Sequence, residues 1–224
     1  MLDIYVGEEA KSRILEQGLH QGMFDVFLGA SGGPKWFTLF GLDKYLFGEF
    51  FKDRIVPLDM VGSSAGAFRS ACFSQESPAE AITELAMRYS AITYPNNPSA
   101  EMITQSAIEM TEHLFSNGNE SQIINNPIFR PHFIVAKAKG LIGKENKLIQ
   151  GAGLISSMLL NRVSRKYLNY SFERFVFMPP HSDLKIVDPY QIQTHYVPFD
   201  KDNVKSALMA SGAIPYVMKG IKIP

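Results

Sequence analysis

Residues Leu58 to Cys72 read LDMVGSSAGAFRSAC and contain the clearest structural pattern of the chain. A short strand-like run comes first, and small residues follow, as in a helix that packs closely against a sheet. Between them, Gly62 to Gly66 fits the pattern G-x-S-x-G, with Ser64 at its centre. This pattern predicts a strand, a sharp turn that exposes the Ser64 hydroxyl, and a helix whose N-terminal dipole favours negative charge there.

A second glycine-rich segment lies upstream, after a strand expected at 24–28. It reads GASGGPK from Gly29 to Lys35 and leads into an apolar stretch, 36–51, that we expect to form a buried helix. The segment fits neither a P-loop nor the dinucleotide-binding pattern G-x-G-x-x-G, because its lysine and glycines are wrongly spaced. Free backbone amides at a helix start suit an oxyanion. We therefore expect this loop and Ser64 to line one crevice at the carboxyl ends of neighbouring strands.

The rest of the chain alternates short apolar runs with helical patterns, which predicts an α/β domain with a mostly parallel central sheet. No linker rich in proline, glycine or serine divides it, so we expect a single domain over 1–224. Another helix is expected to start at Ser77, capped by that side chain in a box with Glu80. The remaining strands are expected at 133–136, 172–177 and 196–197, and the remaining helices at 65–72, 100–114, 155–168 and 202–210.

Composition excludes several classes of protein. Lysine plus arginine and aspartate plus glutamate both number 22, and this balance argues against a dedicated nucleic-acid binder. The single cysteine, Cys72, cannot form an intramolecular disulfide or a multi-cysteine zinc cluster. The N-terminus lacks the pattern of a signal peptide, and the longest chargeless stretch is too short to span a bilayer. These features favour a cytoplasmic protein, and nothing in the sequence indicates a metal or a cofactor.

A nucleophilic serine needs a base, and the sequence leaves its identity open. In α/β-hydrolases the order is serine, acid, histidine, and here Asp183 or Asp188 could precede His195. These acids lie only a few residues before the histidine, too close for two residues on separate strand-end loops, so this triad fits poorly. His132 and His195 are expected to be packed or rim side chains. A third alternative is a non-catalytic lipid-binding protein that keeps the pocket but lacks the base.

Three ordered segments resemble the motifs of patatin-like serine acyl hydrolases. Ala30 to Lys35 is similar to the family's glycine-rich oxyanion motif, Asp59 to Phe68 to its nucleophile elbow, and Ala210 to Pro215 to its A-S-x-A-I-P signature. The resemblance covers most of the chain. It implies a three-layer α/β/α fold and hydrolysis of acyl esters of lipids by a serine–aspartate dyad without a histidine. A lipid substrate also implies transient contact with a membrane surface.

The resemblance assigns roles residue by residue. Ser64 becomes the nucleophile, and the amides of Gly32 and Gly33 form the oxyanion hole. The residues that flank these groups in the motifs are Ser31, Lys35, Gly62 and Gly66. In the family the dyad aspartate follows the A-S-x-A-I-P signature in an Asp-Gly motif, and no Asp-Gly follows Pro215 here. The resemblance therefore implies that the dyad aspartate lies outside these 224 residues.

Several apolar and basic positions have two interpretations. Methionines on helical patterns are expected to fill gaps in the core, with an acyl-chain groove as the alternative; they are Met87, Met102, Met110 and Met158. The segment 154–160 is expected to be a buried helix face, with a lipid-facing edge as the alternative. The basic segment 137–147 is expected to be a solvated loop, with contact to anionic headgroups as the alternative.

Overall fold

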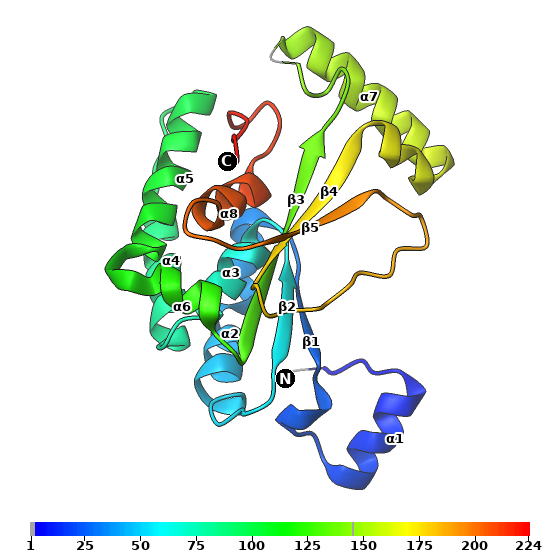
Figure 1. Ribbon diagram of the computed structural model, residues 1–224. Helices are drawn as coiled ribbons and strands as arrows, with labels where there is room; N and C mark the ends of the chain where they lie inside the picture. The colour runs from blue at the N-terminus through cyan, green and yellow to red at the C-terminus, as the bar shows by residue number, and fades with distance from the viewer. Residues whose placement is uncertain (1–2, 145) are drawn as a thin grey trace.

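The computed structural model describes residues 3–144 and 146–224, and a single five-stranded sheet organises them (Figure 1). The strands lie side by side in chain order. The first three are parallel, β4 runs antiparallel to β3, and β5 is parallel to β4. The predicted α/β class with a mostly parallel sheet is thus confirmed. The strands are β1 (Val26–Gly29), β2 (Leu58–Gly62), β3 (Phe129–Ala138), β4 (Phe172–Met178) and β5 (Thr194–Pro198).

Helices flank the sheet on both sides in Figure 1, consistent with a three-layer α/β/α arrangement. On one side lie α2 (Phe40–Tyr45), α3 (Ala65–Phe73), α4 (Pro78–Ala91), α5 (Ala100–Leu114), α6 (Asn119–Asn125) and α8 (Val204–Gly212). On the other side lie α1 (Glu8–Gln17), α7 (Lys147–Val163) and the segment that joins β4 to β5. Short helices of other types are η1 (Gln21–Met23), η2 (Gly33–Leu39), η3 (Leu46–Phe50), η4 (Ser116–Gly118) and η5 (Arg165–Tyr170).

The core lies between the sheet and α3. Leu58 and Met60 of β2 are fully buried, as are Ala67 and Ala71 of α3. The small side chains of α3 allow its backbone to approach the strands closely, as the sequence pattern predicted. Around it, phenylalanine rings fill the remaining space, and the Phe47 ring stacks on the Phe73 ring with 3.7 Å between centroids. This packing holds α3 against the face of the sheet, next to the carboxyl end of β2.

The segment 36–51 differs from the single buried helix that we expected. It is divided into the 3-10 helix η2, the α-helix α2 and the π-helix η3. Its buried side chains are Trp36, Asp43, Phe47 and Phe51, whereas Tyr45 is exposed. The segment packs on one side only. It is therefore less buried than its apolar composition led us to expect. The buried Asp43 carboxylate accepts two hydrogen bonds from Arg69 of α3, at 2.7 and 2.5 Å.

One helix cap and one helix start differ from those expected. The helix α4 does begin directly after Ser77, as predicted. The Ser77 side chain makes no capping hydrogen bond, because its backbone (φ −116°, ψ 76°) departs from the extended conformation of a typical capping residue. The helix expected at 155–168 instead begins at Lys147, where the Asn146 side chain accepts hydrogen bonds from two main-chain N–H groups of the first turn. Among the described residues, no helix combines the length and apolar character needed to cross a bilayer.

The expected burial of the methionines and of 154–160 was largely wrong. Met110 packs against the core, but the other three are exposed: Met87, Met102 and Met158. Most of the apolar side chains of α7 are exposed. The basic segment 137–147 is not a single loop either. Lys137 belongs to β3, and its ammonium lies 3.9 Å from the Glu173 carboxylate of β4, because the two residues pair across the strands.

Candidate active site

Ser64 lies between β2 and α3 with a backbone conformation that is rare for a residue with a side chain. Its φ is 54° and its ψ is −125°. A non-glycine residue held there costs on the order of 1–3 kcal/mol. The turn is stabilised from the helix side, since the Ala67 and Phe68 amides donate to the Ser64 carbonyl at 2.9 and 3.1 Å. The strand, sharp turn and helix predicted around this serine are therefore all present.

Glycines are required around this turn because backbones meet there. A Cβ atom on Gly62 would lie 2.4 Å from the carbonyl carbon of Gly66. A Cβ atom on Gly66 would lie 2.0 Å from the carbonyl oxygen of Gly29 at the end of β1. Neither position can hold a larger residue without moving α3 away from the sheet. The two glycines of the G-x-S-x-G pattern thus allow the first turn of α3 to sit against both strands.

The glycine-rich loop after β1 lies beside the elbow, as the sequence predicted. Gly29 and Gly62 are register partners at the ends of adjacent parallel strands. The Ser31 hydroxyl donates to the Ser63 carbonyl at 3.1 Å and joins the two loops. Gly33, which starts η2, has a φ of 51° that glycine adopts without strain. Lys35 is exposed, and its ammonium makes no ion pair with any residue that the structure describes.

Three main-chain N–H groups near Ser64 have no hydrogen-bond acceptor within the described part of the chain. They belong to Gly32, Gly33 and Ala65. The Ala65 amide is the first of α3, where the helix dipole adds positive potential. Amides of this kind can stabilise the negative charge that develops on a carbonyl oxygen under attack. The sequence indicated the two glycines, and the structure adds Ala65 by its position after the serine.

Ser211 of α8 is a site residue whose contact the sequence did not reveal. Its Oγ accepts a hydrogen bond from the Ser64 main-chain N–H at 3.0 Å and donates one to the Ile134 carbonyl at 2.7 Å. This hydroxyl is buried and links the elbow to β3. The sequence marked Ser211 only by its place in the segment from Ala210 to Pro215, which resembles a family motif. Its partner, however, is 147 positions away in the chain.

The buried ion pair between Asp43 and Arg69 holds α3 from its other side. Desolvation raises the pKa of the Asp43 carboxyl, and the hydrogen bonds and charge of Arg69 oppose that shift. Arg69 also lies over the Phe27 and Phe73 rings, at 5.7 and 5.8 Å from their centroids. The helix that follows Ser64 is therefore fixed against α2 as well as against the sheet. Such anchoring resists the strain of the turn.

No histidine side chain among the described residues bonds to Ser64. His195 of β5 is the register partner of Phe175 in β4, and its ring stacks on that phenylalanine at 4.6 Å. Three strand spacings separate β5 from β2, which places His195 about 14 Å from the elbow. The Asp188 carboxylate forms an ion pair with the Arg174 guanidinium, with 2.8 Å between Oδ2 and Nη2. Within the described residues, no carboxylate or imidazole bonds to the Ser64 hydroxyl.

His132 is packed in the interior, as expected. Its side chain is fully buried, with Nδ1 2.9 Å from the Arg130 carbonyl oxygen and Nε2 2.8 Å from the Ser182 Oγ. The Asp59 carboxylate lies 3.7 Å from Nε2 and accepts a 2.7 Å hydrogen bond from Arg130. Burial lowers the pKa of the His132 imidazole, more strongly than Asp59 raises it. This network supports the sheet and does not reach Ser64.

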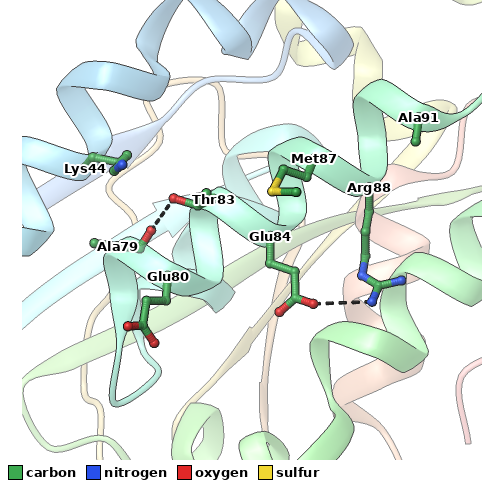
Figure 2. Close-up of a pocket in the computed structure, with 8 residues that line it drawn as sticks. All are labelled: Lys44, Ala79, Glu80, Thr83, Glu84, Met87, Arg88 and Ala91. Carbon is green, nitrogen blue, oxygen red and sulfur yellow. Dashed lines mark hydrogen bonds and ion pairs between the residues drawn. The ribbon is translucent and has the colours of Figure 1, made fainter.

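The structure has a wide open depression of about 710 Å³ on its surface (Figure 2). Lys44 of α2 and residues of α4 line it. Some of its polar groups are bonded to near neighbours on α4. The Thr83 hydroxyl donates to the Ala79 carbonyl at 2.6 Å, and Arg88 donates to Glu84 at 3.3 Å. The depression therefore gives no sign of a built ligand site.

The described residues include no group of three or more histidine, cysteine, aspartate or glutamate side chains arranged to hold a metal ion. Comparisons with protein-family models, with curated proteins and with solved structures gave no match to this chain.

Proposed function

We propose that this protein is a serine acyl hydrolase for lipid or other carboxyl esters, with Ser64 as its nucleophile. The backbone of Ser64, at φ 54° and ψ −125°, is the observation that carries the proposal. Glycine would occupy this conformation without strain, so a serine there is more costly than the fold requires. Serine nucleophiles on strand-to-helix turns are held in this way, with the hydroxyl exposed.

The proposed reaction proceeds through an acyl-enzyme. The Ser64 oxygen attacks the ester carbonyl, the bond to the alcohol breaks, and the alcohol leaves with a proton. Water then attacks the acyl carbonyl, the bond to the serine oxygen breaks, the carboxylic acid leaves with the water oxygen and one of its protons, and the serine oxygen takes the other proton. The amides of Gly32, Gly33 and Ala65 would stabilise the oxyanion in both steps. The base that takes the serine proton is not assigned to any described residue.

A lipid substrate is supported by the surroundings of the elbow and by the resemblance to patatin-like hydrolases. Ser211 contacts Ser64, and the chain continues from it through Ile214 and Val217, both of which are exposed apolar residues. The helix α8 ends at Gly212, one residue after Ser211, so the segment that follows it starts close to the elbow. An acyl chain could lie along such a surface, where a polar substrate would gain nothing.

A fluorophosphonate probe tests the nucleophile directly, because it reacts with activated serines. The wild-type chain should be labelled on the peptide that contains Ser64, as read by mass spectrometry. Ser64→Ala should abolish labelling. Ser63→Ala is the matched control, because its side chain makes no hydrogen bond within the described residues, and it should keep the label. Labelling that survives Ser64→Ala, or that is absent from the wild type, would contradict the proposal.

Turnover of p-nitrophenyl esters of increasing acyl length separates an enzyme from a non-catalytic lipid-binding protein. Hydrolysis that disappears in Ser64→Ala and increases with acyl length is expected. A large loss of hydrolysis in His195→Ala, with the fold intact, would favour the serine–acid–histidine alternative instead.

A further inference from the structure

Helix α7 presents an apolar face outward, away from the rest of the molecule. It projects beyond the carboxyl end of β3, at the same end of the sheet as the elbow (Figure 1). An ordinary surface helix turns its apolar stripe to the core. The outward side chains, with their exposed fractions, are Leu148 (86%), Ile155 (59%), Met158 (63%), Leu159 (57%) and Val163 (76%).

The inward side of α7 is made of small and polar residues. Gly153 and Ser157 are buried there, and a Cβ atom on Gly153 would lie 2.9 Å from Leu141. The Gln150 side chain donates to the Ile142 carbonyl at 3.0 Å, which ties the helix to the loop after β3. The helix is thus attached through its polar side. Its apolar face stabilises nothing within the described residues and needs another explanation.

The charges next to this face have one sign. Lys147 and Arg162 lie on α7, Arg165 and Lys166 follow in η5, and the sequence from 146 to 172 contains no acidic residue. None of these four side chains forms an ion pair with a described residue. Tyr170, at the end of η5, is exposed and stacks with Tyr167. Apolar residues flanked by basic and aromatic ones are typical of helices that lie in a membrane interface.

We infer that α7 docks the protein on an anionic lipid surface, with its apolar face inserted among the headgroups and its basic residues on the lipid phosphates. A second copy of the chain fits this face less well. A two-fold dimer through α7 would bring the four basic side chains of each copy toward those of the other. At 17 residues, the helix is about 25 Å long, enough to lie along the surface.

Docking through α7 would place the lipid surface near Ser64. The Tyr216 hydroxyl donates to the Lys147 carbonyl at 2.5 Å, and Ser211 accepts from the Ser64 amide. The chain between Ser211 and Tyr216 can span at most about 17 Å. The docking face therefore begins within reach of the proposed nucleophile. The choice of lipid as partner rests on the proposed function, although binding itself can be measured without it.

Vesicle sedimentation tests the docking with the full chain. Wild-type protein should sediment with vesicles of phosphatidylcholine and phosphatidylserine, and more weakly with phosphatidylcholine alone. The double variant Ile155→Asp and Leu159→Asp should lose at least about tenfold in vesicle affinity, because two inserted apolar side chains are replaced by charges. The matched control is Met87→Asp, an equally exposed apolar residue on α4, which should bind as the wild type does.

The basic residues can be tested apart from the apolar face. Arg162→Gln with Lys166→Gln should weaken binding to the phosphatidylserine vesicles by about fivefold for each charge removed, with little change on phosphatidylcholine. Added salt should reproduce this loss. Unchanged circular dichroism spectra will show that the variants are folded, as expected for substitutions at exposed positions.

Three results would overturn the inference. The first is the absence of sedimentation by the wild-type chain, and the second is equal binding by the wild type and the double aspartate variant. The third is a wild-type dimer in light scattering that the same variant dissociates, which would assign the face to a second copy. Ser64→Ala should bind vesicles normally, and the α7 variants should keep fluorophosphonate labelling in solution. A failure of docking and a failure of the proposed nucleophile are therefore distinguishable.

Discussion

The main-chain N–H of Ser64 donates a hydrogen bond to the Oγ of Ser211, 3.0 Å away, across 147 positions of sequence. The same Oγ donates its own hydrogen to the Ile134 carbonyl of β3. A strained backbone persists only where its surroundings hold it. Ser211 supplies part of that support, because its Oγ accepts the hydrogen bond from the Ser64 main-chain N–H. The strain at the elbow is thus maintained by a residue from the far end of the chain.

Replacing Ser211 with alanine should leave the Ser64 amide without its partner. We expect a loss of about 1–3 kcal/mol in the free energy of unfolding, measured by urea denaturation, because a buried donor becomes unsatisfied. Labelling of Ser64 by the fluorophosphonate should also slow. Ser206→Ala, on the same helix and without a side-chain hydrogen bond to a described residue, is the control and should change little. Equal effects of the two substitutions would contradict a specific role for Ser211.

Ser64→Gly should be more stable than Ser64→Ala, by on the order of 1–3 kcal/mol, because glycine adopts φ 54° without strain. Thermal unfolding of both variants measures the difference, and both should lose labelling. At the neighbouring Ser63, whose φ is not positive, the order should reverse, with glycine less stable than alanine. An alanine variant at position 64 as stable as the glycine variant would show that the turn relaxes.

Gly66→Ala should disrupt the junction between α3 and β1. The added Cβ would lie 2.0 Å from the Gly29 carbonyl oxygen, and overpacking of this kind costs roughly 1–3 kcal/mol or more. Gly41→Ala is the matched control, since nothing lies within 4 Å of its added Cβ on α2. That variant should be stabilised by about 0.5–1 kcal/mol through helix propensity. Urea denaturation of the two variants should therefore give shifts of opposite sign.

The buried His132 should make the fold sensitive to acid. Burial lowers the pKa of the imidazole below its ordinary 6.5, so the unfolded chain binds the proton more readily than the folded one. Stability should be constant above that value and fall as the pH decreases below it, with a slope of at most about 1.4 kcal/mol per pH unit. His132→Gln should flatten this dependence. The neighbouring Asp59 and Arg130 stay in place in that variant, so the flattening can be assigned to the imidazole.

Local patterns predicted the elements closest to the site. The strand, turn and small-residue helix around Ser64 are present, and the helix expected at 100–114 is α5 (Ala100–Leu114). These features depend on residues a few positions apart, such as the two glycines that let α3 approach the strands. The expectations that failed depend on which side of an element meets a neighbour. The segment 36–51 and α7 are both apolar enough to be buried, yet each packs through only part of its surface.

Local sequence patterns were enough to predict the α/β class, the elbow with Ser64 at its centre and the glycine loop beside it, because glycine spacing and apolar runs act within a few residues. Other features arose only from the packing of distant parts of the chain. The tertiary structure brought Ser211 to the elbow, moved His195 to a distant strand and turned the apolar face of α7 outward. Those outcomes depend on strand order and on which surfaces pack together. The free energies that decide them come from contacts between residues far apart in the chain.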